Sequence, residues 1–134
     1  MHKIKVRWVI LDNNKKVFLV REIKKHFYYL PWWTLEEWES FKECLKREIQ
    51  EELWVIPIIW DIISIREFEN NWKFQLDVWF NIKNFNDYIN IDKSKATHSH
   101  EYYNEWFYSF KELEWKDLRP KNLEKLLNKK ISIL

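Results

Sequence analysis

Three carboxylates lie close together near the middle of the chain, at Glu48, Glu51 and Glu52. At about 100° per residue, these positions share one side of a helix. Neighbouring carboxylates repel one another, and a hard divalent cation such as Mg²⁺ relieves that repulsion, because it takes oxygen ligands from a few carboxylates and from substrate phosphates. The spacing fits a solvated acidic helix face, with salt bridges to Arg47 and its neighbours, equally well. A metal site and a plain surface therefore both remain open.

The segment that must position these carboxylates, residues 40–53, has the pattern of an amphipathic helix. Ser40 and Glu43 have the spacing of a capping box, in which each side chain binds an exposed backbone N–H of the first turn. One apolar stripe follows, made of Phe41, Leu45, Ile49 and Leu53. The glutamates border this stripe instead of lying opposite it, so we expect them beside the buried surface.

Apolar and polar residues alternate in segments that precede and follow this helix in the sequence, which predicts β-strands that form a sheet. A hairpin is expected around Asn70 to Trp72, and a second helix opens at Pro120. The expected strands cover residues 3–12, 17–21, 62–68, 74–82 and 105–109, and the second helix covers residues 120–129.

The chain contains no glycine and ten tryptophans. Average glycine usage is about 7%, and glycine is the default residue where the backbone needs a positive φ. Tryptophan occupies such places here: Trp32 and Trp33 in a turn, Trp54 after the predicted helix, and Trp72 at the hairpin tip. Our hypothesis is that most of these tryptophans stand for glycines. The gene would use UGA as a glycine codon, and its sequence would have been translated with a code that reads UGA as tryptophan. Trp106 is the one we expect to be genuine.

A long motif around the glutamates carries a family resemblance. The chain reads Trp33-x5-Glu39-x7-Arg47-Glu48-Ile49-x-Glu51-Glu52-x-Trp54-Val55. This resembles the Nudix box, Gly-x5-Glu-x7-Arg-Glu-U-x-Glu-Glu-x-Gly-U, in which U is aliphatic. Every position matches except the two glycines, and both are tryptophan here. The resemblance implies one Nudix domain over residues 1–134, an α/β/α sandwich with a mixed β-sheet.

The resemblance also implies an activity, namely hydrolysis of the diphosphate linkage in a nucleoside diphosphate derivative. Nucleoside triphosphates, oxidised nucleotides and ADP-ribose-like compounds all remain open as substrates. The cofactor would be Mg²⁺, with Mn²⁺ as an alternative. Glu48, Glu51, Glu52 and the backbone carbonyl of Trp32 would hold the metal. Glu39 and Arg47 would form the ion pair that fixes the loop to the helix.

Two further residues enter as weaker candidates. A later acidic residue serves as general base in some members of the family, and Glu101 is preferred here over Glu105. A solvated loop carboxylate is an equally good interpretation of Glu101. Arg21 ends the second strand, where a basic residue near the substrate is common in the family, although an ordinary surface arginine explains it as well.

The overall composition limits the partners that we expect. The chain has 23 basic and 21 acidic residues and a net charge of +2, so it lacks the basic excess of a nucleic-acid-binding or membrane-surface protein. A lone cysteine, Cys44, excludes an internal disulfide. With no signal peptide or apolar span of membrane length, we expect a cytoplasmic protein whose partner is a nucleotide-derived small molecule, and a homodimer stays open.

Two alternative functions remain. The first is a Nudix-fold module that binds a nucleotide without turnover, although such a module would not need all the glutamates. The second is a single-stranded nucleic-acid-binding domain that uses the aromatic residues as stacking platforms. The second loses its main support if most tryptophans stand for glycines. Substrate choice depends on loops that this motif does not specify.

Overall fold

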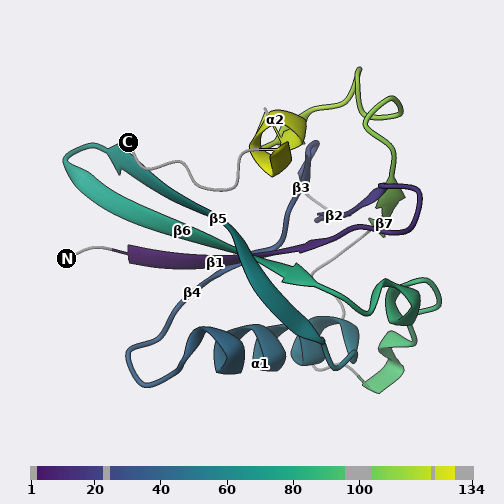
Figure 1. The fold of residues 1–134 in the computed structure, drawn as a ribbon, viewed down its shortest axis with the longest axis horizontal. Coiled ribbons are helices and arrows are strands. Elements are labelled where there is room, and N and C mark those ends of the chain that lie inside the picture. The colour runs from purple at the N-terminus through teal and green to yellow at the C-terminus, as the bar shows by residue number, and fades with distance from the viewer. Residues whose placement is uncertain (1–2, 23–24, 96–103, 122, 129–134) are drawn as a thin grey trace.

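Two four-stranded sheets and two helices make up the described part of the chain in a computed structural model (Figure 1). The structure describes residues 3–22, 25–95, 104–121 and 123–128. Its strands are β1 (Lys3–Ile10), β2 (Val17–Arg21), β3 (Tyr28–Tyr29), β4 (Trp32–Thr34), β5 (Ile59–Asn70), β6 (Lys73–Ile82), β7 (Asn104–Tyr108) and β8 (Leu118–Arg119). The helices are α1 (Phe41–Leu53) and α2 (Leu123–Asn128), with short 3-10 turns at Phe85–Tyr88 and Lys93–Lys95.

The central sheet has the strand order β4-β1-β6-β5 and is mixed, as the sequence predicts. Strands β1 and β6 run parallel from the Lys3–Gln75 pair to the Ile10–Ile82 pair, and the other neighbours are antiparallel. Successive side chains of a strand point to opposite faces. Val6, Trp8 and Ile10 therefore join the core that includes the buried side of α1, and Val9 joins a second core on the other face.

Helix α1 covers one face of the central sheet, below it in Figure 1. Both bonds of the predicted capping box are present: the Ser40 hydroxyl accepts from the Glu43 N–H, and the Glu43 carboxylate accepts from the Ser40 N–H. The helix ends at Trp54, which lies in the left-handed region with φ 56°. The buried side consists of Cys44, Leu45, Ile49, Glu52 and Leu53. The predicted helix is confirmed, and the acidic Glu52 lies within its buried side.

The second sheet has the order β7-β2-β3-β8, and α2 lies on the opposite side of the central sheet from α1 (Figure 1). Strands β2 and β7 pair antiparallel, which confirms the two longer predicted strands of this sheet. The sequence did not predict β4 and β8, because strands of two or three residues are too short to show alternation. The part of α2 that the structure describes begins at Leu123, three residues after Pro120.

The tip of the hairpin between β5 and β6 requires positive φ angles of its residues. Asn70 pairs with Lys73, so the loop consists of Asn71 and Trp72 alone, with φ angles of 50° and 67°. Two-residue hairpins favour turns with positive φ at both positions, for which Asn-Gly is the preferred pair. Trp72 thus occupies a glycine position of the turn, with 91% of its surface exposed.

The tryptophans differ widely in environment, from fully buried to almost fully exposed. Trp8 and Trp79 lie inside strands and are fully buried, although neither indole N–H has a hydrogen-bond partner within the described part of the structure. Trp38, Trp72 and Trp115 are at least four-fifths exposed. Trp106, the residue expected to be genuine, is 49% exposed on β7. Burial therefore favours Trp8 and Trp79 as packed side chains over Trp106.

Candidate active site

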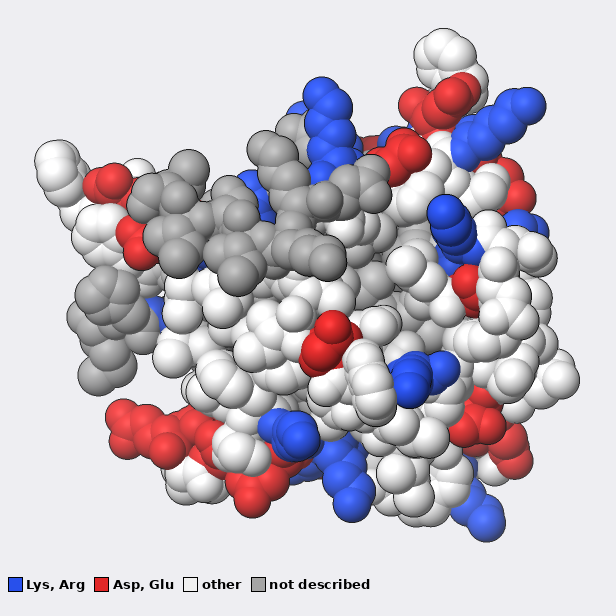
Figure 2. All heavy atoms as spheres, viewed as in Figure 1, with Lys and Arg blue, Asp and Glu red and all other residues white. Residues whose placement is uncertain are grey.

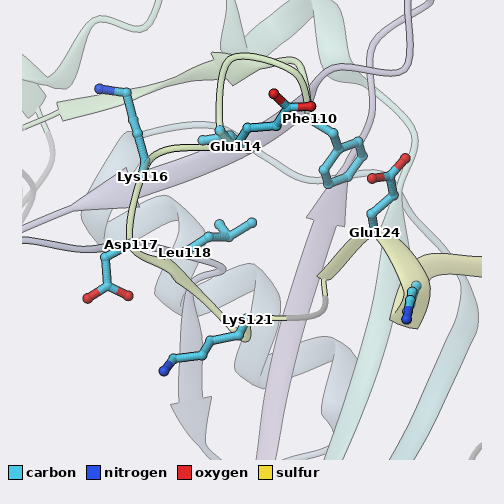
Figure 3. A pocket seen from close by; sticks show the side chains of 9 residues that line it. Phe110, Glu114, Lys116, Asp117, Leu118, Lys121 and Glu124 are labelled. Carbon is cyan, nitrogen blue, oxygen red and sulfur yellow. The ribbon is translucent and has the colours of Figure 1, made fainter.

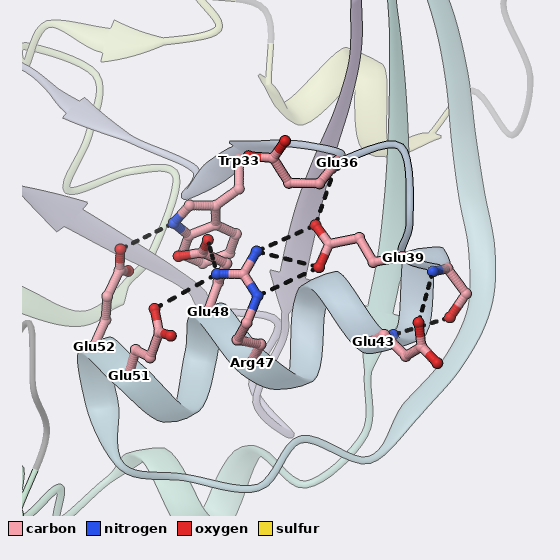
Figure 4. A network of polar contacts seen from close by, with 9 residues as sticks. Trp33, Glu36, Glu39, Glu43, Arg47, Glu48, Glu51 and Glu52 are labelled. Carbon is pink, nitrogen blue, oxygen red and sulfur yellow. Dashed lines mark hydrogen bonds and ion pairs between the residues drawn. The ribbon is translucent and has the colours of Figure 1, made fainter.

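Arg47 lies at the centre of a polar network on α1 (Figure 4). On one side its Nη2 donates to Glu39 Oε1 at 3.1 Å and its Nε to Glu39 Oε2 at 3.3 Å. On the other side its Nη1 donates to Glu48 Oε1 at 2.6 Å and lies 3.6 Å from Glu51 Oε2. A planar guanidinium suits this arrangement, because its fork binds a carboxylate through two parallel bonds. Arg47 thus ties the loop before α1 to the helix and to two of its glutamates.

Glu39 is the loop end of this network, and its side chain is only 6% exposed. Burial alone would raise the pKa of Glu39. Hydrogen bonds from Arg47, from the backbone N–H of Glu36 and from the thiol of Cys44 together hold that pKa below its usual value. Hydrogen bonding to Glu39 in turn raises the pKa of Arg47. The pair therefore stays charged in neutral solution, as its predicted positioning role requires.

Glu52 has different surroundings from the other two glutamates of the helix. Its residue surface is 2% exposed, and its Oε1 accepts a hydrogen bond of 2.9 Å from the indole Nε1 of Trp33. In Figure 4 the Glu52 carboxylate points toward the Trp33 ring, away from Glu39. The two residues are 19 positions apart in the sequence. The contact therefore brings the last turn of the helix to β4.

The carboxylates of α1 have the chemistry of a hard-cation site, but they are engaged by other groups. Mg²⁺ prefers carboxylate oxygens and backbone carbonyls. Across the residues that the structure describes, no group of three His, Cys, Asp or Glu side chains is arranged as a metal site. Arg47 contacts Glu48 and Glu51, and Trp33 contacts Glu52. The donor set therefore fits the metal by type, whereas its present arrangement is closed by a guanidinium and an indole.

A cavity of about 340 Å³ opens beside Glu52. It lies between the β3–β4 region and the last turns of α1. Its lining consists of Glu22, Lys25, Tyr29, Trp32, Trp33, Thr34 and Glu52. Lys25 brings a positive charge into this cavity and forms an ion pair of 3.2 Å with Glu22. Lys25 carries no signal in the sequence, because it lies in a polar connection with no motif around it.

The remaining predicted residues fall in different places. The backbone of Trp32 begins β4 opposite Arg7. Arg21 ends β2 on the side of Tyr28, whose ring centroid is 5.9 Å from the guanidinium carbon, and it does not line the cavity beside Glu52. Glu101 lies outside the described residues. Glu105 lies in β7 opposite Val20, and its side chain is likewise outside the described part. The roles of Arg21, Glu101 and Glu105 therefore stay predictions.

Two other cavities lie away from the buried glutamate. One of about 390 Å³ lies beside α2 and includes Leu113, Leu118 and Lys121 in its lining, with Lys116 and Asp117 at its edge (Figure 3). The other, about 580 Å³, lies along α1 between Trp38 and Trp54, and its lining includes the predicted site residues Glu39, Arg47 and Glu51. Figure 2 shows acidic and basic side chains next to each other along the α1 side of the molecule, and this face carries no broad basic surface among the described residues.

Comparison with known proteins decides the family. The family model described as NUDIX domain matches residues 1–128. The chain belongs to the NUDIX family. The family resemblance and the α/β Nudix fold predicted from the sequence are therefore confirmed.

Solved structures show the same fold at low sequence identity. A NUDIX hydrolase from Nitrosomonas europaea is similar with a TM-score of 0.74 and 19% identity over 96% of this chain and 87% of that chain. A MutT protein from Methanosarcina mazei Go1 is similar with a TM-score of 0.69 and 19% identity, over 95% of this chain and 91% of that chain. An ADP-ribose pyrophosphatase from Streptococcus suis is similar with a TM-score of 0.64 and 18% identity, over 94% of this chain and 87% of that chain. No curated protein sequence matches the chain. Within the described residues, no helix has the length and apolar character needed to cross a membrane.

Proposed function

We propose that this NUDIX protein hydrolyses the diphosphate linkage of a nucleoside diphosphate derivative in a Mg²⁺-dependent reaction. The observation that carries the proposal is the row of carboxylates on α1, of which Glu52 lines the cavity with Lys25 beside β4. Similar structures include proteins named MutT and ADP-ribose pyrophosphatase. These names support a nucleotide substrate and leave its leaving group open.

The metal would be held by Glu48, Glu51, Glu52 and the backbone carbonyl of Trp32. Mn²⁺ would serve as a substitute, because it also accepts carboxylate and carbonyl oxygens. When bound, the metal would neutralise the diphosphate and lower the pKa of the attacking water. The donor set suits such an ion, since all its members are oxygen atoms and Glu52 is a buried carboxylate.

The residues of the chain would supply positioning and charge. Phosphoryl transfer needs mainly alignment and charge stabilisation from the protein. Lys25 would contact phosphate oxygens as a point charge from the cavity wall. The Glu39–Arg47 pair would keep the loop at a fixed distance from the helix. Glu101 would accept the proton of the attacking water, and Arg21 would contribute to substrate binding.

The indole of Trp33 works against this function. It donates a hydrogen bond to Glu52 and helps to line the cavity where substrate phosphates would enter. The expectation of a turn with positive φ at Trp32 and Trp33 is wrong, because both residues lie in strand β4 and neither has a positive φ. The left-handed backbone at Trp54 and Trp72 supports the hypothesis that glycine is the native residue at these two positions. We therefore propose that the chain with these tryptophans is impaired and that glycine at position 33 restores activity.

A nucleotide panel tests the proposal. The Trp33→Gly chain is incubated with nucleoside triphosphates, oxidised nucleotides and ADP-ribose, with Mg²⁺ or with a chelator. Release of a nucleotide or of a phosphate-containing fragment that requires Mg²⁺ is the expected result. Saturable nucleotide binding without product would instead identify a binding module. Salt-dependent binding of single-stranded nucleic acid that survives Glu51→Gln and Glu52→Gln would identify a nucleic-acid-binding domain.

A further inference from the structure

We propose that Arg7 is a positioning residue for the metal site, because it fixes the chain that leads into the Trp32 carbonyl. The inference rests on the proposed function, since it concerns the backbone ligand of that site. Arg7 lies on β1, next to β4, and is distant in sequence from the glutamate motif. Its role is argued from the contacts that its guanidinium makes with two other segments.

The first contact anchors the Arg7 side chain to the middle of the central sheet. Its Nε donates to Asp77 Oδ2 at 2.8 Å, and the Asp77 side chain is 1% exposed. The other oxygen, Asp77 Oδ1, accepts from Gln75 Nε2 at 2.7 Å. The Arg7 side chain itself is 16% exposed. A buried carboxylate that is bonded on both oxygens gives the guanidinium one fixed orientation.

The second contact reaches the segment before β4. Arg7 Nη1 donates to the backbone carbonyl of Leu30 at 3.3 Å. Pro31 follows, and its ring restricts φ to about −65°. Trp32 then pairs across the strands with Arg7 itself. The three residues from Leu30 to Trp32 are therefore held at one end by the Arg7 side chain and at the other by the pairing of β4 with β1.

Neighbouring contacts fix the same short segment from other sides. The Leu30 N–H donates to the Arg119 carbonyl at 3.3 Å, and the Leu30 side chain is fully buried. Lys5 places its Nζ 3.5 Å from the centroid of the Trp32 ring. Of these groups, only Arg7 also bonds a side chain of β6 within the described structure. Arg7 therefore links the middle of the sheet to the backbone of the proposed ligand.

Lysine at position 7 should not reproduce this link. A guanidinium presents several donors in one plane, whereas an ammonium is a single point charge on a flexible stem. Lysine would still neutralise Asp77, but it could not hold Asp77 and the Leu30 carbonyl in one rigid geometry. The Arg7→Lys variant therefore separates charge compensation from positioning.

The test uses the full 134-residue chain with Trp33→Gly as reference, so that the indole does not engage Glu52. Arg7→Lys is compared with Arg7→Met/Asp77→Asn, which removes both charges and leaves an amide to accept from Gln75. Arg119→Lys is the matched control, because it keeps the backbone carbonyl that accepts from Leu30 and alters only a half-exposed side chain paired with Asp117. Mn²⁺ binding is measured by electron paramagnetic resonance, hydrolysis by product release, and folding by thermal unfolding.

We expect Mn²⁺ binding to weaken by about 10- to 100-fold in both position-7 variants, the range found when groups that orient metal ligands are removed. The control should bind as the reference does. The double variant keeps the test valid if Arg7→Lys fails to fold, since buried ion pairs can be replaced by neutral groups. Binding within about twofold of the reference in a folded variant would overturn the inference alone. A reference that neither binds Mn²⁺ nor hydrolyses a nucleotide would overturn the proposed function, and this inference with it.

Discussion

The two ends of the site hold their carboxylates in different ways. At the loop end, Glu39 binds the charged Arg47 through two oxygens and also accepts from a backbone N–H. At the far end of the helix, Glu52 is more deeply buried and accepts a hydrogen bond from an uncharged indole. A buried carboxylate is costly unless a cation or several hydrogen bonds compensate its charge.

This difference supports a proposed division of tasks between the two glutamates. Glu39 binds the guanidinium of Arg47, so its proposed task is to hold the loop. Glu52 lines the cavity and accepts a hydrogen bond from an indole, so its proposed task is to bind a cation that comes from solution. Under this proposal, the indole at position 33 lies where that cation would be held.

The largest expected effect is a difference in hydrolysis rate between variants of Glu52 and of Glu39. In the Trp33→Gly chain, Glu52→Gln should lower the Mg²⁺-dependent rate by more than about 100-fold, because it removes a direct metal ligand. Glu39→Gln should lower it by about 10- to 100-fold, because it only loosens the positioning of the loop. Steady-state kinetics at saturating Mg²⁺ measure both. Equal losses, or a larger loss at Glu39, would contradict the division.

A second prediction concerns stability against pH. The pKa of Glu39 is lowered in the folded protein from its ordinary value of 4.5. Its ionised form therefore stabilises the fold above that ordinary value, and the contribution is lost as pH falls through the lowered pKa. The free energy of unfolding should differ between the parent chain and Glu39→Gln near neutral pH, and this difference should shrink below about pH 4.

Denaturant unfolding at a series of pH values measures the effect. Glu43→Gln is a suitable control, because Glu43 caps the same helix through the Ser40 N–H without contacting Arg47. A difference between the parent and Glu39→Gln that stays constant down to about pH 3 would show that the Arg47 contact does not depend on the charge of Glu39.

A smaller effect is expected where the helix ends. Trp54 holds a φ of 56°, and its N–H donates to the Gln50 carbonyl at 3.0 Å. A left-handed residue with a Cβ costs about 1–2 kcal/mol, which glycine avoids. Trp54→Gly should therefore raise the free energy of unfolding by about 1 kcal/mol. Trp54→Ala is the control, because alanine removes the indole and keeps the Cβ. Equal stability of the two variants would refute the backbone explanation.

The smallest effect concerns the thiol beside Glu39. Burial, together with hydrogen bonding to Glu39, raises the pKa of Cys44 to about 12. The thiolate is the reactive form, so a thiol reagent near pH 8 should leave Cys44 unmodified in the folded chain and modify it after denaturation. Mass spectrometry distinguishes the two states. Rapid modification of the folded protein would mean that the loop end of the site opens more readily than its contacts suggest.

The sequence predicted the glutamate helix closely, because local signals determine it. The capping pair Ser40–Glu43 marks its start, an apolar stripe marks its buried side, and Trp54 marks its end. The Glu39–Arg47 contact followed from the family motif and is present. The β5–β6 hairpin was also predictable, although both strands extend beyond the expected ranges, and β5 contains irregular register near Ile62.

Contacts between distant segments were not predictable in the same way. The Arg7–Asp77 pair joins residues 70 positions apart across two parallel strands, and local alternation does not show which distant strands become neighbours. The cavity with Lys25 depends on how β3 and β4 meet the last turns of α1. The burial of Trp8 and Trp79 was missed as well, because composition suggested a glycine origin for most tryptophans and said nothing of their packing.

The central claim is that the indole of Trp33 occupies the place of the cation at Glu52. The most direct measurement compares nucleotide hydrolysis by the unaltered chain and by Trp33→Gly as Mg²⁺ is titrated, with ³¹P magnetic resonance to follow the products. A hydrogen bond to a charged group is worth about 1.5–3 kcal/mol, so Trp33→Gly should need about 10- to 100-fold less Mg²⁺ for half-maximal rate. The same Mg²⁺ requirement and the same rate in both chains would contradict the account.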